Sequence, residues 1–130
     1  MNVIINIDVP LLEPAIAFYC NAFDLKLERL LDDDVAELTG ASTRVYLLQQ
    51  AEDSIPSEFT SDVRHYQRHW TPIHIDIVVD DLVSAAERVI KAGAKMESEC
   101  IEWRGSRCIS FADPFGHGFC LIQFEQGSYC

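Results

Sequence analysis

The feature that most constrains the fold is an order of elements that occurs twice along the chain. Each half holds an apolar strand, an amphipathic helix and then further strands, and a polar stretch separates the halves. The letters repeat as well. Residues 5–7 (I-N-I) match residues 75–77 (I-D-I), and residues 46–49 (Y-L-L-Q) match residues 120–123 (C-L-I-Q). The pattern predicts two copies of one βαβββ unit.

Module one covers residues 1–50. An apolar strand is followed by a helix whose Leu12, Ile16, Tyr19 and Phe23 fall on one face, and these residues are expected to be buried. Pro14 is tolerated because it lies in the first helical turn. The expected elements are a strand at 2–9, a helix at 13–23, and strands at 26–31, 35–38 and 44–50.

Module two covers residues 71–130 and repeats this order. Its first strand alternates with a period of two, so that His74, Asp76 and Val78 share one face and three isoleucines share the other. The helix that follows has a predicted buried stripe and ends at Gly93. The stripe consists of Leu82, Ala86, Val89 and Ile90, and the expected elements are strands at 73–79, 95–103, 107–112 and 119–125 and a helix at 81–92.

Composition excludes several classes of function. The chain has 10 Lys plus Arg and 21 Asp plus Glu, so its formal net charge is 10 − 21 = −11. Such a surplus repels phosphate backbones, so nucleic acid is not an expected partner. No apolar run approaches the roughly 20 residues of a membrane helix, and no basic leader precedes the first strand. The 130 residues are expected to form a single soluble, cytoplasmic domain.

The five cysteines are scattered and include no C-x-x-C pair. This usage is typical of free thiols in a reducing compartment, and no structural zinc site is expected. The linker, residues 51–70, is polar and ends in the only basic cluster of the chain, residues 64–70. Two interpretations stay open for it: a solvated connection with a helical turn, or a lid over a site, because linkers of this length are often functional.

Three stretches carry a resemblance to a known family. They are residues 5–25, with A-F-Y and later F-D-L; residues 74–93; and D-P-F-G-H-G-F at 113–119, before the last strand. Together they resemble the vicinal oxygen chelate superfamily, which includes glyoxalases, bleomycin-resistance proteins and extradiol dioxygenases. The resemblance implies an α+β fold in which two tandem βαβββ modules form a cupped, barrel-like mixed sheet with the helices packed outside. It also implies a homodimer.

The resemblance also implies where a metal would be held. Metal-using members take one ligand from the first strand and one from the last strand of each module, which here places the four positions on Ile4, Tyr46, His74 and Cys120. Only His74 is of the usual ligand type, and Ile4 cannot coordinate. Hard divalent metals prefer several oxygen or imidazole ligands. We therefore expect no catalytic metal and no cofactor.

Each candidate residue has a structural and a functional interpretation. His74 is either hydrogen-bonded in place or a general base, with Asp76 on the same face. Cys120 is either a buried apolar thiol or part of a cavity wall. Tyr46 offers a ring with a polar tip, and Trp103 and Trp70 are either packing residues or aromatic walls. The expected ligand-binding residues are His74, Tyr46, Cys120, Asn6, Asp76 and Trp103.

Two functions from different classes remain. The first is a metal-free protein that binds a small organic molecule around His74, as the resistance proteins of the family do. The second is an enzyme: a lyase or isomerase that uses His74 as base, or a dioxygenase-like metalloenzyme. A structural domain without a ligand is a third interpretation. Metal content separates the first two.

Overall fold

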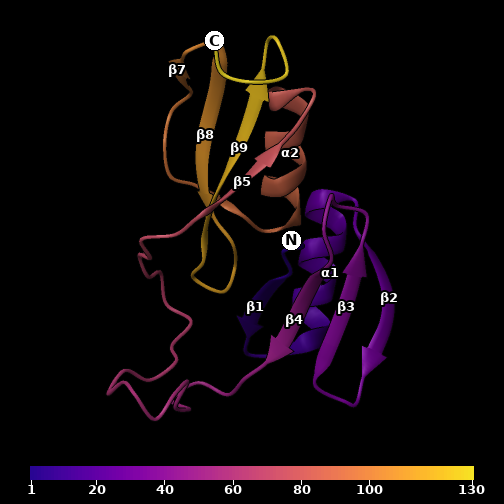
Figure 1. Ribbon diagram of the computed structural model, residues 1–130, viewed down its shortest axis with the longest axis vertical. Helices are drawn as coiled ribbons and strands as arrows, with labels where there is room; N and C mark the ends of the chain where they lie inside the picture. The colour runs from indigo at the N-terminus through magenta and orange to yellow at the C-terminus, as the bar shows by residue number, and fades with distance from the viewer. The chain divides into compact units, whose positions relative to one another are not determined.

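The computed structural model describes residues 1–130 and divides them into two compact units, residues 1–67 and residues 68–130. Two helices and nine strands form two separate mixed sheets, one in each unit (Figure 1). The α+β class and the doubled order of elements are confirmed. No strand of one sheet pairs with a strand of the other, so the sheets do not close into the barrel that the resemblance implied.

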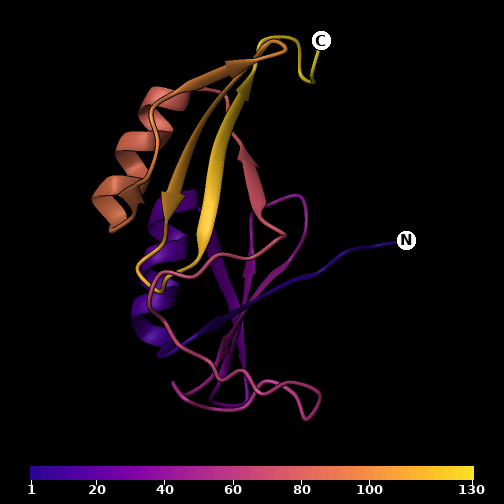
Figure 2. The same cartoon turned by 90° about the vertical axis from the view of Figure 1, so that its left-hand side faces the viewer.

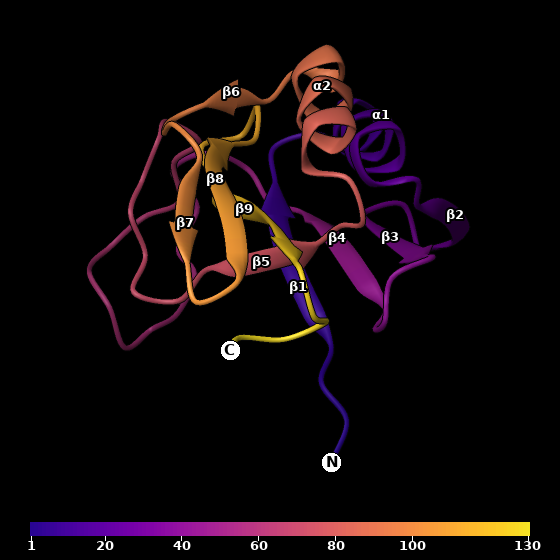
Figure 3. The same cartoon turned by 90° about the horizontal axis from the view of Figure 1, so that it is seen from above.

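The first unit contains a four-stranded sheet in the order β1-β4-β3-β2. Strand β1 runs parallel to β4, and the other neighbours are antiparallel. Helix α1 covers one face of this sheet (Figure 3). The elements are β1 (Ile5–Val9), α1 (Leu12–Phe23), β2 (Lys26–Leu31), β3 (Val35–Thr39) and β4 (Val45–Gln49).

Two details of the predicted first unit were wrong. Residues 2–4 lie outside β1, because its register with β4 begins at Ile5 and Val45. The buried stripe of α1 is also displaced. Leu12 and Tyr19 are buried as predicted, but Ile16 and Phe23 are only half-buried. Small alanines bring α1 close to the sheet instead, and the buried set is Leu12, Ala15, Phe18, Tyr19 and Ala22.

The second unit contains a five-stranded sheet in which β5 runs parallel to β9. The order is β5-β9-β8-β6, and β7 also pairs with β8. Helix α2 packs on one face of this sheet (Figure 2). The elements are β5 (Ile75–Val78), α2 (Leu82–Ala92), β6 (Lys95–Met96), β7 (Ile101–Trp103), β8 (Ser106–Ala112) and β9 (Gly118–Phe124).

Helix α2 agrees closely with its prediction. The Asp81 carboxylate accepts a hydrogen bond from the Ser84 N–H at 3.1 Å, which caps the first turn, and Gly93 (φ 124°) ends the helix. Leu82, Ala86 and Val89 are buried as predicted. Ile90 is 45% exposed and does not belong to the stripe. Neither helix of the chain is long and apolar enough to span a bilayer.

The glutamine that ends both repeated tetrapeptides, Gln49 and Gln123, has a structural role. The side-chain carbonyl of Gln49 accepts a hydrogen bond from Leu12 N–H at 3.0 Å, and that of Gln123 accepts one from Leu82 N–H at 2.8 Å. In each unit the last strand thus satisfies a backbone donor in the first turn of its helix, where intrahelical partners are lacking. The sequence repeat is therefore also a repeat of one helix-start contact.

The predicted strand at 95–103 is split in the structure. Glu97 N–H still bonds to Ser110 O at 2.8 Å, but the Ser98 hydroxyl accepts from Ser110 N–H at 2.9 Å, where a backbone carbonyl would otherwise pair. The ladder is interrupted there because a side chain has replaced the main chain, and β6 and β7 lie on either side of the break. His74 likewise falls just before β5 rather than within it.

The linker forms no helix or strand, so its predicted helical turn is absent. Its first part is held within the first unit: Arg64 Nε lies 2.7 Å from Asp8 Oδ2, and the Tyr66 hydroxyl donates to Gln50 O at 2.6 Å. Its last residues are held within the second unit, where His69 N–H donates to Gly116 O at 3.1 Å. The boundary between the two units therefore lies inside the basic cluster.

Candidate functional site

A polar row crosses the sheet of the second unit on the face away from α2. Leu121 on β9 is buried on the helix side, so its neighbour Cys120 points to the opposite face. Cys120 is the register partner of Asp76 on β5 and of Ser110 on β8. Residues in register on adjacent strands share a face, so carboxylate, thiol and hydroxyl stand side by side.

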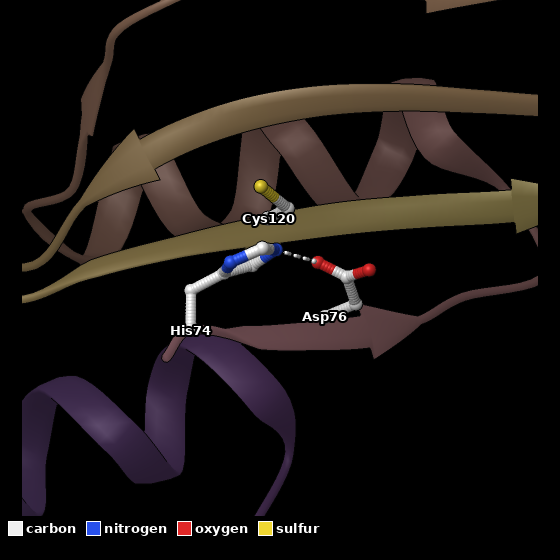
Figure 4. A group of neighbouring side chains, drawn as sticks. All are labelled: His74, Asp76 and Cys120. Atoms are coloured by element: carbon white, nitrogen blue, oxygen red, sulfur yellow. Dashed lines mark ion pairs between the residues drawn. The ribbon is translucent and has the colours of Figure 1, made fainter. Parts of the chain in front are cut away.

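His74 joins this row from the segment before β5. One of its ring nitrogens, Nε2, lies 3.1 Å from Asp76 Oδ1 (Figure 4). The side chains of His74 and Asp76 are 60% and 36% exposed. One imidazole nitrogen, one carboxylate oxygen and the Cys120 sulfur all lie within 4.8 Å of one another. The structure thus brings together three of the predicted site residues, and all three are accessible.

Two further groups contact the Cys120 sulfur. The Ser110 hydroxyl lies 3.4 Å from it, and the Cys108 thiol is hydrogen-bonded to it. Burial raises the pKa of Cys108 to about 12, and the neighbouring Cys120 and Asp76 act in the same direction. Cys108 therefore stays protonated at neutral pH. All five cysteines are free thiols, as predicted.

A pocket of about 210 Å³ opens beside this row. Its volume equals that of about seven water molecules, at roughly 30 Å³ each. The sequence missed several of its lining residues, because they come together only when distant segments fold. The lining consists of Arg68, Trp70, Thr71, His74, Glu97, Ser110, Phe111, Gly118, Phe119 and Cys120.

An ion pair forms one wall of the pocket. Arg68 Nε lies 2.8 Å from Glu97 Oε2, and Arg68 Nη2 donates to Glu97 Oε1 at 2.9 Å. The Arg68 guanidinium lowers the pKa of Glu97, and Glu97 in turn raises the pKa of Arg68. Gly118 permits this packing: a Cβ there would meet Arg68 Nη2 at 2.6 Å. The basic cluster of the linker was the one sequence signal for Arg68.

The first unit has a corresponding row with different contents. Asn6 on β1 is in register with Tyr46 on β4, and Tyr46 is in register with Glu37 on β3. Glu37 is only 1% exposed, and Arg29 Nε lies 3.2 Å from its carboxylate, which Arg44 also contacts. Burial opposes ionisation of Glu37, but hydrogen bonds from Arg29 and Tyr46 outweigh it, and the pKa of Glu37 is lowered.

Sequence reasoning missed Glu37, although a lone glutamate inside an apolar strand is an unusual pattern. It did pair Asn6 with Tyr46, and these two are neighbours within the first unit. Trp103 lies apart from these two rows. It lies at the β7–β8 hairpin, 60% exposed, with its ring 5.2 Å from that of Tyr129. Trp103 does not line the pocket.

The family's usual metal positions do not fit a metal in this chain. Ile4 has no donor atom, and the Tyr46 hydroxyl is engaged with Glu37. The donors that do converge are His74, Asp76 and Cys120, a nitrogen, oxygen and sulfur set of the kind that zinc accepts. The family positions lack the several oxygen or imidazole ligands that a hard divalent metal prefers. For a metal such as zinc, the second unit offers three candidate ligands.

No curated protein matches the sequence significantly. Among solved structures, the fosfomycin resistance protein FosX from Listeria monocytogenes shares 22% identity over 95% of this chain and 92% of its own, with a TM-score of 0.70. A lactoylglutathione lyase from Agrobacterium tumefaciens shares 16% identity over 99% of this chain and 97% of its own, with a TM-score of 0.67.

A glyoxalase/bleomycin resistance protein/dioxygenase family enzyme from Burkholderia phytofirmans shares 14% identity over 93% of this chain and 96% of its own, with a TM-score of 0.71. At such identities the likeness is one of fold. A family model, described as a glyoxalase-like domain, matches residues 4–122, which is nearly the whole chain. The chain therefore belongs to the glyoxalase-like domain family.

Proposed function

We propose that the protein binds a small organic molecule in the pocket around His74 and that it does so without a catalytic metal. The observation that carries this proposal is the pocket itself. It places an imidazole, a hydroxyl and a thiol at one concave site within the second unit. A few convergent polar groups in a concave site are the usual features of a ligand pocket.

The charges around the pocket limit the ligand. The Arg68 guanidinium is matched by Glu97, and the Asp76 carboxylate is matched by the His74 ring, so each of these charged groups already has a partner. The net charge of −11 disfavours anionic molecules. The pocket volume suits a compact molecule of on the order of ten non-hydrogen atoms. A small, neutral, polar organic compound fits these conditions best.

The structural neighbours support this proposal in broad terms. One is described as a fosfomycin resistance protein and another as a lactoylglutathione lyase, and both names refer to small molecules. Their identities to this chain, 22% and 16%, do not carry a substrate across. We use them only as support for a small-molecule site on this fold.

An enzyme is the second candidate, and the convergence of His74, Asp76 and Cys120 favours it. In one version the imidazole acts as a general base in a lyase or isomerase. In the other, these three donors hold a borderline divalent ion such as zinc. Elemental analysis separates the versions. One tightly held metal per chain, lost in His74→Ala, would overturn the metal-free proposal.

Trp70 provides a direct binding assay. It lines the pocket, and the only other tryptophan is Trp103. In a Trp103→Phe background, quenching of Trp70 fluorescence reports occupancy of the pocket. Small molecules released from the protein purified from its own host supply the ligands to be tested. Failure of every such molecule to change Trp70 fluorescence would contradict the proposal.

His74→Ala should weaken binding by about 1.5–3 kcal/mol, the amount expected for one hydrogen bond to a charged group. The fold should survive because the side chain is exposed. His65→Ala, an exposed histidine outside the pocket lining, is the matched control and should bind with unchanged affinity. Equal affinity of both variants would show that the ligand does not contact His74.

Homodimer formation, which the family resemblance implied, stays a proposal. Closed twofold pairing is the commonest arrangement of small soluble oligomers. Light scattering at micromolar concentration tests it. A mass of 14.7 kDa, the mass of one chain, would contradict it.

A further inference from the structure

We propose that Cys120 is a nucleophile which His74 deprotonates, that Asp76 positions the imidazole, and that the pocket takes electrophilic small molecules, in particular α,β-unsaturated carbonyl compounds. This inference rests on the proposed function, since it names the class of molecule that the same pocket binds. It assigns different tasks to three side chains that the register of β5 and β9 brings together.

The geometry is that of a nucleophile, a base and an orienting carboxylate. Asp76 Oδ1 holds His74 Nε2 at 3.1 Å, and the Cys120 sulfur lies within 4.8 Å of this pair. Figure 4 shows the sulfur of Cys120 and the imidazole of His74 on the same side of the sheet. Contacts of this kind are often long without substrate and shorten in the complex. The His74 side chain is 60% exposed, so it has room to rotate relative to the sulfur.

Two hydrogen-bonding groups lie next to the Cys120 sulfur. The Ser110 hydroxyl lies 3.4 Å away, and the Cys108 thiol is hydrogen-bonded to Cys120. Burial and the neighbouring Cys120 raise the pKa of Cys108 to about 12, so Cys108 keeps its proton. Both groups can therefore donate a hydrogen bond to the Cys120 sulfur once His74 has taken its proton.

Cys120 is also the cysteine with access to the pocket. It lines the pocket and is only partly buried, whereas Cys108 does not line it. A cysteine with an imidazole, hydrogen-bond donors and an open pocket beside it is the expected setting of a reactive thiol.

The reaction balances without a further reagent. The proton of the Cys120 S–H passes to His74, and the sulfur forms a bond to the β-carbon of the unsaturated carbonyl compound. The carbon–carbon π bond breaks, and its electron pair moves to the α-carbon as an enolate. The imidazolium, held by Asp76, then returns its proton to the α-carbon. The product is a thioether, and no electrons are gained or lost overall.

The test uses acrylamide, a small neutral α,β-unsaturated amide, on the intact chain at pH 7 with a chelator present. Peptide mass spectrometry follows adduct formation at each cysteine over time. Cys130 is exposed and serves as an internal control in the same molecule. We expect Cys120 to react at least tenfold faster than Cys130, since a positioned base contributes about 10² or more. Equal rates at the two cysteines would overturn the proposal.

Three variants assign the roles. In His74→Gln the rate at Cys120 should fall at least tenfold while the rate at Cys130 is unchanged, and an unchanged Cys120 rate would overturn the proposal. In Asp76→Asn the rate at Cys120 should fall at pH 7 while the rate at Cys130 is unchanged, because the imidazole loses the carboxylate that orients it. Asp76→Glu keeps a carboxylate and should retain more of the rate. Equal Cys120 rates in Asp76→Asn, Asp76→Glu and wild type would show that Asp76 does not position His74.

Two measurements on the chain with Cys120 intact separate this inference from the proposed function. A change of Trp70 fluorescence with a pocket ligand reports binding, and adduct formation at Cys120 reports the nucleophile. Binding together with slow labelling of Cys120 would overturn the nucleophile and leave the binding function intact. Absence of ligand binding would instead count against the proposed function.

Discussion

The two sheets carry equivalent rows of residues with opposite consequences. In the first unit, Tyr46 and Glu37 occupy the row, and Arg29 covers the carboxylate. In the second unit, the register places Cys120 and Ser110 at the corresponding positions. One row is a closed network in which Arg29, Arg44 and Tyr46 all contact the buried Glu37 carboxylate. The other is lined by small side chains and opens into a pocket.

The difference shows that smaller side chains at matching positions of a repeated unit can leave room for a site. The first sheet carries a tyrosine and a glutamate at these positions, whereas the second carries a cysteine and a serine, both of which line the pocket. The residues next to these rows carry opposite charges. Next to Glu37 on the neighbouring strand lies the positively charged Arg29. Next to Ser110 lies the negatively charged Glu97, which bonds to Ser110 through its main chain and pairs with Arg68 from the linker. The same backbone thus supports a structural network in one unit and a candidate site in the other.

The largest expected effect tests whether the two cores are equivalent. Leu47 and Leu121 occupy matching positions on β4 and β9, and both are fully buried. Leu47→Ala and Leu121→Ala should each lower the free energy of unfolding by about 2–5 kcal/mol, because each leaves a cavity. Urea denaturation measures this loss. Leu30→Ala, at a half-exposed leucine on β2, is the control and should cost much less.

The next largest effect is expected when a large side chain fills the open row of the second unit. Cys120→Tyr introduces the residue that the first unit has at this position, and its ring should occupy the pocket. Binding of a pocket ligand should weaken at least tenfold, which is about 1.4 kcal/mol. Trp70 fluorescence in the Trp103→Phe background measures it. Cys100→Tyr, at an exposed cysteine outside the pocket lining, should bind normally, and equal binding by both variants would refute the filled-row explanation.

The smallest effect concerns the closed network at acid pH. Because the pKa of Glu37 is lowered in the folded chain, its pairing stabilises the fold above the ordinary value of 4.5 and is lost as the pH falls through the lowered value. Glu37→Gln should therefore reduce the urea midpoint at pH 7, and its difference from wild type should shrink towards pH 3. A difference that stays constant with pH would mean that Glu37 acts through packing rather than charge.

Much of this architecture could be predicted from the sequence. The period-two and helical patterns gave both βαβββ units, because alternation and stripe spacing are local properties. The α1 stripe was misplaced because alanines, which carry little hydrophobic signal, proved to be the contact residues. The break between β6 and β7 depends on the Ser98 hydroxyl, which replaces a main-chain hydrogen-bond partner. The alternation of apolar and polar residues carries no signal for such a side-chain hydrogen bond.

Some residues of the candidate site could be predicted from the sequence and others could not. His74 and Asp76 were placed on one face by strand alternation, and the repeat linked Cys120 to them by analogy with Tyr46. Arg68, Glu97 and Ser110 were not foreseen, since their approach requires the linker and the β6–β8 segments to fold together. Trp103 was assigned to the site by residue type alone, and the hairpin carries it elsewhere.

The open row of the second unit is proposed as a ligand site. Native mass spectrometry of the chain purified from its own host, side by side with Cys120→Tyr, shows whether a ligand is bound there. We expect a small molecule on the wild-type chain that is absent from the variant. A wild-type chain at its bare mass, or the same molecule on both proteins, would contradict it.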